Sequence, residues 1–226
     1  MKGLVCILML VATAAALAAD SPKHPHGKSF QHGVDGYNKM VDTEIWSIAP
    51  SKILDKQGTM TSDGSNGGGE SQVLMCFQSI IGDAAEQLPP KANIVKATLT
   101  VVAFDPGNTV YLHRMLVPWN RASTWNSMGD GISVDDHEAT RVRDGLTFGH
   151  IVMDKQSVQF DVTDTVQAWA NGAPNFGWVF VNTGFNGWDF YSSDWIETDL
   201  HPKLEVTYLE PDDNATPQTA VSLITR

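Results

Sequence analysis

The sequence is poor in cysteine, which excludes a fold held together by disulfide bonds. It contains two cysteines, Cys6 and Cys76. Cys6 lies within an apolar N-terminal segment that we expect to be cleaved, so the mature chain would keep Cys76 alone. A single cysteine cannot form an internal disulfide, and the fold must rest on its hydrophobic core. Cys76 stands in a strand-like run, which favours a buried, inert thiol over a nucleophile.

Positive charge is also scarce. The chain has 15 lysines and arginines against 26 aspartates and glutamates, a formal net charge of -11 at pH 7. Nucleic-acid binding depends on a basic face that contacts phosphates, and adsorption to an anionic membrane surface depends on the same feature. We therefore expect no nucleic-acid partner and no attraction to anionic membranes.

Long apolar runs are confined to the N-terminus, where residues 1–19 have the pattern of a signal peptide. Lys2 supplies a positive end, and residues 4–17 form an apolar core that is too short for a membrane span. Small residues at 18 and 19 suit cleavage just before Asp20. We expect a secreted protein, extracellular, at the cell surface or in the periplasm, with no membrane insertion after signal cleavage.

The rest of the chain predicts one domain between two irregular segments. Residues 20–41 contain several prolines and glycines without an apolar period, which predicts a flexible leader. Alternation of apolar and polar residues begins near Val41, so we place the folded domain at residues 42–209. Residues 210–226 are polar and contain two prolines, which is typical of a tail.

Alternating residues within the domain predict an all-β fold. Residues 97–103 and 204–208 place apolar side chains at every second position, as in strands with one buried face. Helical spacing appears only at Val166, Trp169 and Ala170, and Gly172 suits the position just past a helix end. We therefore expect antiparallel sheets with one short helix.

Seven short segments occur in the order and at the spacing of a known domain. One of them contains Asp161-Val-Thr163 followed by Trp169, and another is the closing segment Pro202-Lys-Leu-Glu-Val-Thr-Tyr208. Together they resemble the DNRLRE domain, which is known from disaggregatase-related proteins and is related to an alginate-binding module family. The resemblance implies a jelly-roll β-sandwich and a non-catalytic module in a secreted or surface protein. The matching segments are residues 42–45, 73–77, 88–100, 119–126, 160–169, 175–177 and 202–208.

Aromatic residues are the candidates for ligand contact, because aromatic faces stack on sugar rings. Trp119, Trp125 and Trp169 match framework positions of the resembled domain, and we expect them to be buried. The loop region from residue 185 to 199 is not accounted for by the core. We expect Trp188, Tyr191 and Trp195 to stack on a sugar there, and Asn186 and Asp189 to hydrogen-bond its hydroxyls.

The same region is rich in carboxylates, which suggests a structural calcium ion. Asp194, Glu197 and Asp199, with Asp189 nearby, offer the hard oxygen ligands that calcium prefers. The alternative is an acidic loop that is simply solvated. We expect no required cofactor, and the calcium ion is an optional structural addition.

Three functional hypotheses follow. The first is a secreted, non-catalytic carbohydrate-binding or adhesion module for a polysaccharide or cell-surface glycan. The acidity of the chain favours a neutral glycan unless Arg114, Arg121, Arg141 and Arg143 gather into one patch. The second is a structural cell-surface or extracellular-matrix protein that acts through protein partners or self-assembly. The third, a polysaccharide-degrading enzyme, ranks last because no pair of carboxylates stands out.

Overall fold

The computed structural model describes residues 24–105, 107–147 and 155–211. The expected signal peptide and nearly all of the expected C-terminal tail lie outside these residues. The described part contains no helix long and apolar enough to cross a membrane. Its strands and helix are β1 (His26–Gln31), β2 (Met40–Trp46), β3 (Thr59–Asn66), β4 (Gly69–Phe77), β5 (Asn93–Asp105), β6 (Val110–Met115), β7 (Ala139–Thr147), β8 (Gln156–Asp161), α1 (Thr163–Ala170), β9 (Trp178–Asn182), β10 (Trp188–Tyr191) and β11 (Lys203–Leu209).

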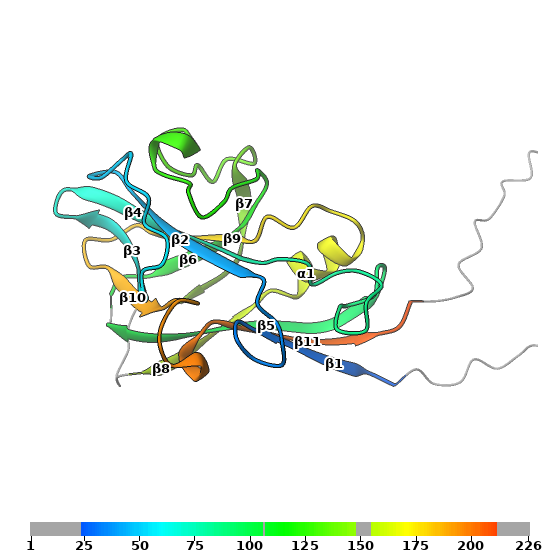
Figure 1. The fold of residues 1–226 in the computed structure, drawn as a ribbon. Coiled ribbons are helices and arrows are strands. Elements are labelled where there is room, and N and C mark those ends of the chain that lie inside the picture. The colour runs from blue at the N-terminus through cyan, green and yellow to red at the C-terminus, as the bar shows by residue number, and fades with distance from the viewer. Residues whose placement is uncertain (1–23, 106, 148–154, 212–226) are drawn as a thin grey trace, which may run out of the picture.

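The strands form one antiparallel sheet that curls into a half-barrel. Its order is β1-β11-β5-β10-β3-β4-β9-β6-β7, with β2 paired to β4 and β8 paired to β5. In Figure 1, β4, β2 and β9 lie above β5, β11 and β1, and α1 lies toward one end. The predicted all-β antiparallel fold with one short helix is confirmed.

The main core fills the concave side of the curled sheet. Ala97, Leu99, Val101 and Ala103 of β5 are all fully buried, so the alternation seen in the sequence marks a true inward face. α1 adds Trp169, whose ring centroid lies 4.7 Å from that of Trp178 on β9. In the described part of the chain Cys76 is a free thiol, so burial of such aromatic and aliphatic side chains is the main stabilising contribution.

A smaller apolar cluster lies on the outer face of β2, β4, β6 and β9, under the segment between β6 and β7. That segment contributes Trp119 and Trp125, which are partly buried against the cluster. The Trp119 indole Nε1 donates a hydrogen bond of 2.7 Å to the carbonyl of Phe176. Full burial was therefore predicted correctly for Trp169, whereas Trp119 and Trp125 keep one side exposed.

The prediction of a flexible leader over residues 20–41 is wrong for its later part. Residues 26–31 form β1, which pairs in register with β11 from His26 opposite Tyr208 to Gln31 opposite Lys203. Only Phe30 among the inward positions of β1 is apolar, and it enters the core. The alternating pattern was therefore too short to reveal a strand whose stability comes from backbone pairing with β11.

Helix α1 begins and ends for local reasons. Asp161 accepts hydrogen bonds from the Thr163 backbone N–H at 3.0 Å and the Thr163 hydroxyl at 2.6 Å, which fixes the turn that enters the helix. At the other end Gly172 has φ of +100°, as expected for the residue just past a helix. The turn between β8 and α1 forms one wall of the cleft described next.

Candidate functional site

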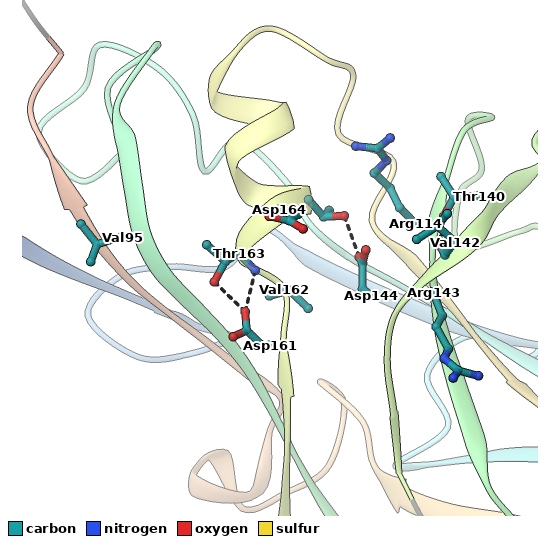
Figure 2. A pocket seen from close by; sticks show the side chains of 11 residues that line it. Val95, Arg114, Thr140, Val142, Arg143, Asp144, Asp161, Val162, Thr163 and Asp164 are labelled. Atoms are coloured by element: carbon teal, nitrogen blue, oxygen red, sulfur yellow. Dashed lines mark hydrogen bonds between the residues drawn. The ribbon is translucent and has the colours of Figure 1, made fainter.

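A cleft of about 500 Å³ opens between the first half of β7 and the turn from β8 into α1. Within the described residues, β7 pairs only with β6, and β8 pairs only with β5, so these two strands border the open side of the half-barrel. The two strands come close where Gly145 of β7 lies against the ring of Phe160 of β8. The cleft is lined by Val95, Arg114, Thr140, Val142, Arg143, Asp144, Asp161, Val162, Thr163, Asp164 and Thr165 (Figure 2).

Asp144 enters the cleft because of an irregularity in β7. Leu112 pairs with Gly145 and His113 pairs with Arg143, so Asp144 is the extra residue of a β-bulge. Bulges re-aim a side chain locally and recur beside binding sites. Here the bulge turns Asp144 toward α1 and β9.

The Asp144 carboxylate joins three elements beneath the cleft. Its Oδ2 accepts hydrogen bonds of 2.6 Å from the Thr165 hydroxyl and 2.6 Å from the Trp178 indole. Burial raises the pKa of Asp144, although these two hydrogen bonds and the nearby Arg114 act in the opposite direction. Asp144 therefore fixes the position of β7 relative to α1 while remaining at the cleft surface.

Arg114 supplies a guanidinium group on the same side. It stands opposite Trp178 in the pairing of β6 with β9, and so its side chain leaves the sheet from the core face. In Figure 2 it points toward α1, whereas Arg143 points away from Asp144. The Arg143 guanidinium lies 5.3 Å from the centroid of the Tyr111 ring. Among the described residues Arg114 forms no salt bridge, and it lines the cleft near Asp144, whose pKa its charge lowers.

The opposite wall presents carboxylates and hydroxyls in fixed positions. The hydrogen bonds from Thr163 hold the Asp161 carboxylate and lower its pKa, so it stays ionised. The Thr163 oxygen also accepts a hydrogen bond of 3.0 Å from the Ala97 backbone, which anchors this wall to β5. Exposed Val95 and Val142 add apolar surface at the edges of the cleft.

The predicted exposure of Trp188 is wrong. Trp188 is 0% exposed and packs on Phe190 with 5.1 Å between ring centroids. The turn ends at Gly187, and Trp188 already belongs to β10, where it pairs with Ser62. Trp188 and Phe190 point into the core, so Asp189 and Tyr191 point outward. In this structure Trp188 offers no surface for a sugar.

Tyr191 and Trp195 do come together, but on the outer face and without Trp188. Their ring centroids are 4.8 Å apart, and Phe104 lies 4.8 Å from Tyr191. Tyr191 is only 7% exposed, and Trp195 packs so closely on Gly58 that a Cβ there would lie 2.7 Å from the indole. These aromatics form a small packed cluster, which differs from the open platform that we expected.

The predicted hydroxyl-binding residues lie apart from these aromatics or serve the fold. The Asn186 backbone N–H donates to Asn108 Oδ1 at 2.9 Å, and its carbonyl accepts from the Asn108 N–H at 2.8 Å, which joins two loops. Asp189 is half-buried, and burial raises its pKa, with Asp105 and Asp63 adding to the increase. Its Oδ1 has no hydrogen-bond partner within the described residues.

The predicted calcium ligands do not converge. Asp194 forms a salt bridge of 2.9 Å with Arg121, and Glu197 forms one of 3.1 Å with Lys155. Asp199 is exposed in a short 3-10 helix, Thr198–Leu200. In the described ranges no three histidine, cysteine, aspartate or glutamate side chains gather closely enough to hold a metal ion. The arrangement does not fit a calcium site, because two of the carboxylates already have cationic partners.

The sequence pattern does not reveal two buried carboxylates on β2, because polar and apolar residues alternate along this strand. Asp42 is 0% exposed and accepts hydrogen bonds from the Ser193 N–H at 2.7 Å and the Ser193 hydroxyl at 3.1 Å. Glu44 accepts from the Trp46 indole at 2.9 Å and from the Thr61 backbone N–H. Burial raises the pKa of Asp42 to about 6 and that of Glu44 to about 7. The polar residues between the apolar ones suggested a solvent-exposed face, but side chains on both faces of β2 are buried.

The cleft was also missed, since its residues come from four separate segments. The sequence pattern places Asp161 and Thr163 in the structural framework, and nothing in the local sequence marks Asp144 as the extra residue of a bulge. No protein-family model matches the sequence, and neither does any curated protein. The functional argument therefore depends on the fold and on the chemistry of this cleft.

Proposed function

We propose that the protein is a secreted, non-catalytic module that binds a polysaccharide or cell-surface glycan in the cleft between β7 and α1. The observation that carries this proposal is the lining of the cleft. Arg114, which forms no salt bridge among the described residues, lines an open space of about 500 Å³ together with Arg143, three aspartates and three threonines. Secretion follows from the signal-peptide pattern of residues 1–19.

The lining matches the chemistry of a sugar chain. Sugar hydroxyls both donate and accept, so they can pair with carboxylates on one wall and with the Arg114 guanidinium on the other. Hydrogen bonds to charged groups are stronger than neutral ones. The exposed Val95 and Val142 can cover the C–H face of a ring. Because Asp161 is already held by Thr163, little ordering is needed when ligand binds.

The charge of the cleft favours a neutral glycan over a polyuronate. Arg114 and Arg143 line the cleft, but Asp144, Asp161 and Asp164 line it too. The other two arginines lie elsewhere: Arg121 pairs with Asp194, and Arg141 lies 3.7 Å from Asp136. The four arginines therefore form no single basic patch.

The curled sheet is consistent with the jelly-roll sandwich of a DNRLRE-like module. β3 pairs with β10 on one side and β4 on the other, so it joins two arms of the sheet. One arm contains β1, β11, β5 and β8, and the other contains β2, β4, β9, β6 and β7. We assign these arms to the two facing sheets of a sandwich. Core side chains drawn from both arms support this assignment.

A glycan array with the mature protein tests the proposal. Arg114→Gln and Asp164→Asn remove one charge from each wall while preserving size. Each should weaken binding of the array hits by roughly tenfold or more, because a charged hydrogen bond is left unmade. Arg141→Gln is the matched control, since Arg141 lies on β7 but does not line the cleft. Unchanged binding by both cleft variants would remove the cleft from the ligand site.

A separate assay tests whether the protein leaves the bound glycan uncleaved. The hit glycan incubated with protein should show no increase in reducing ends and no unsaturated product over a day. Release of either would replace the binding proposal with an enzymatic one.

One observation favours the alternative of a structural protein. Phe185 and Ile196 are large apolar side chains that are almost fully exposed, and such residues often contact partners. Sedimentation of the mature protein separates the two proposals. A monomer with saturable glycan binding supports the binding module, whereas a filament or defined oligomer without glycan binding supports assembly.

A further inference from the structure

A second open groove, of about 520 Å³, crosses the sheet over β1, β11, β5 and β8. Small side chains contribute to its floor, since Gly27, Thr98 and Thr207 all line it. A Cβ at Gly27 would meet no atom within 4 Å, so the groove is open where it passes over β1. We call this depression the sheet groove.

The sheet groove lies on the outer face of these strands, opposite the core. On β5, Ala97 and Leu99 are fully buried in the core, so Lys96 and Thr98 point to the other face. On β11, Glu205 stands directly opposite Thr98 and shares its face. The outer face therefore presents hydroxyl and charged groups to solvent along the groove.

Three observations place the sheet groove next to the cleft between β7 and α1. Asp161 lines the cleft and stands opposite Thr98, which lines the groove, in the pairing of β8 with β5. Val95 lines the cleft and is followed directly by Lys96, which lines the groove. The hydrogen bonds from Thr163 lower the pKa of Asp161, and the charge of Lys96 lowers it further. Lys96 therefore lies near enough to act on a carboxylate of the cleft.

A β-bulge in β5 brings the two depressions onto one surface. Tyr208 pairs with Ile94 and Thr207 pairs with Lys96, so Val95 is the extra residue of β5. Val95 and Lys96 are consecutive and both exposed, whereas residues of a regular strand alternate between the core and solvent. A ligand that leaves the cleft past Val95 therefore meets Lys96 on the same surface.

We propose that the cleft and the sheet groove form one extended site, which binds a linear neutral polysaccharide along its length as the chain crosses β8, β5, β11 and β1. This inference rests on the proposed function, because the cleft supplies the first sugar contacts. Three inter-strand spacings of about 4.8 Å separate β8 from β1, roughly 14 Å in all. This distance exceeds one sugar ring, so a chain of several sugars is needed to fill the groove.

The groups along the sheet groove suit sugar hydroxyls, which both donate and accept hydrogen bonds. The Thr207 hydroxyl and the Gln159 amide can also do both, and Lys96 donates. Glu205 is held by a salt bridge of 3.1 Å with Lys203, which balances one charge of the groove. A ligand that stops in the cleft makes none of these contacts, so affinity should increase with chain length.

Binding of size-graded linear oligosaccharides tests the extended site. Disaccharides and hexasaccharides of neutral β-glucan, mannan, xylan and galactan would be titrated into the mature protein by calorimetry. For each sugar that binds, the hexasaccharide should bind roughly tenfold or more tightly than its disaccharide, after correction for the number of disaccharide units in the longer chain.

The outcomes separate this inference from the proposed function. Equal corrected affinities, or binding restricted to chain ends or branched glycans of the array, would overturn the extended site and leave the cleft proposal standing. If no oligosaccharide of the series and no glycan of the array binds, the proposed function fails and the extended site fails with it.

Variants locate the additional contacts. Lys96→Ala and Gln159→Ala should each lower the ratio of hexasaccharide to disaccharide affinity by about fivefold, because one hydrogen-bonding group is lost. Lys52→Ala and Gln57→Ala make the same chemical changes outside the cleft and the groove, and should leave the ratio unchanged. All four side chains are exposed, so the fold should tolerate each change. An unchanged ratio in both groove variants would refute the extended site.

Discussion

Replacement of Asp42 by asparagine should make the protein less sensitive to pH. The structure buries Asp42 completely, and its pKa rises from 3.8 to about 6. The folded protein therefore holds this proton more tightly than the unfolded chain does. As the pH rises, the unfolded chain ionises first, so the stability that is fully present below about pH 4 is lost until the pH passes about 6.

The size of the effect follows from the pKa shift. A difference of about two pKa units corresponds to about 3 kcal/mol, lost between roughly pH 4 and pH 6. Asparagine keeps the shape of the side chain, since Oδ1 can accept the Ser193 N–H and Nδ2 can donate to the Ser193 hydroxyl. The variant should therefore gain stability relative to the unmodified protein as the pH rises, by about 1–3 kcal/mol.

Urea unfolding at several pH values from 4 to 8 measures this difference. Asp83→Asn is the control, because the same chemical change is made at an exposed position. Its stability relative to the unmodified protein should not vary with pH in this window. A constant difference between Asp42→Asn and the unmodified protein, or a difference that grows in the opposite direction, would refute the reasoning.

Two further predictions concern the core and the backbone. Trp188→Ala should cost about 3–5 kcal/mol in urea unfolding, because it empties a fully buried site. Trp195→Ala, at a half-buried position, should cost less than half of that, and equal losses would contradict the assigned burial. Gly177→Ala should cost about 2–4 kcal/mol, because Gly177 has φ of +69° and a Cβ there would lie 2.0 Å from a carbonyl oxygen of β4. Gly172→Ala, where φ is +100° but no atom lies within 4 Å, should cost about 1–2 kcal/mol, and the same assay compares the two.

The sequence predicted those strands in which buried apolar residues alternate with polar residues. Ala97, Leu99 and Val101 on β5 and Leu204 and Val206 on β11 follow this rule, and all five are buried. Strands that depend on backbone pairing rather than on apolar side chains were not predictable in this way. β1 has one apolar inward residue, so its sequence pattern predicts a flexible segment.

The direction of a side chain near a turn was harder to predict, because it depends on where the strand begins. Trp188 follows Gly187 and so was expected in a loop, but β10 starts at Trp188 and points it inward. A one-residue difference in the start of a strand reverses every side chain on it. The rings of Tyr191 and Trp195 lie side by side, whereas Trp188 lies on the other face.

The cleft could not be predicted from local sequence, because it is assembled from distant segments. Asp144 reaches Thr165 and Trp178 only because β7 contains a bulge, and a bulge is set by the register of the strand pairing. The sequence identifies Arg114 only as one of four arginines considered for a single basic patch. Its proximity to the start of α1 depends on the curl of the whole sheet.

Mapping the ligand by nuclear magnetic resonance tests the central claim most directly. A glycan that binds the mature protein would be titrated into ¹⁵N-labelled protein, and saturable shifts of backbone amide resonances would be followed. We predict that the largest shifts fall on residues 140–144 of β7 and 161–165 at the start of α1. Saturable shifts concentrated instead on residues 185–199, with the cleft unchanged, would contradict the assignment of the cleft as the binding site.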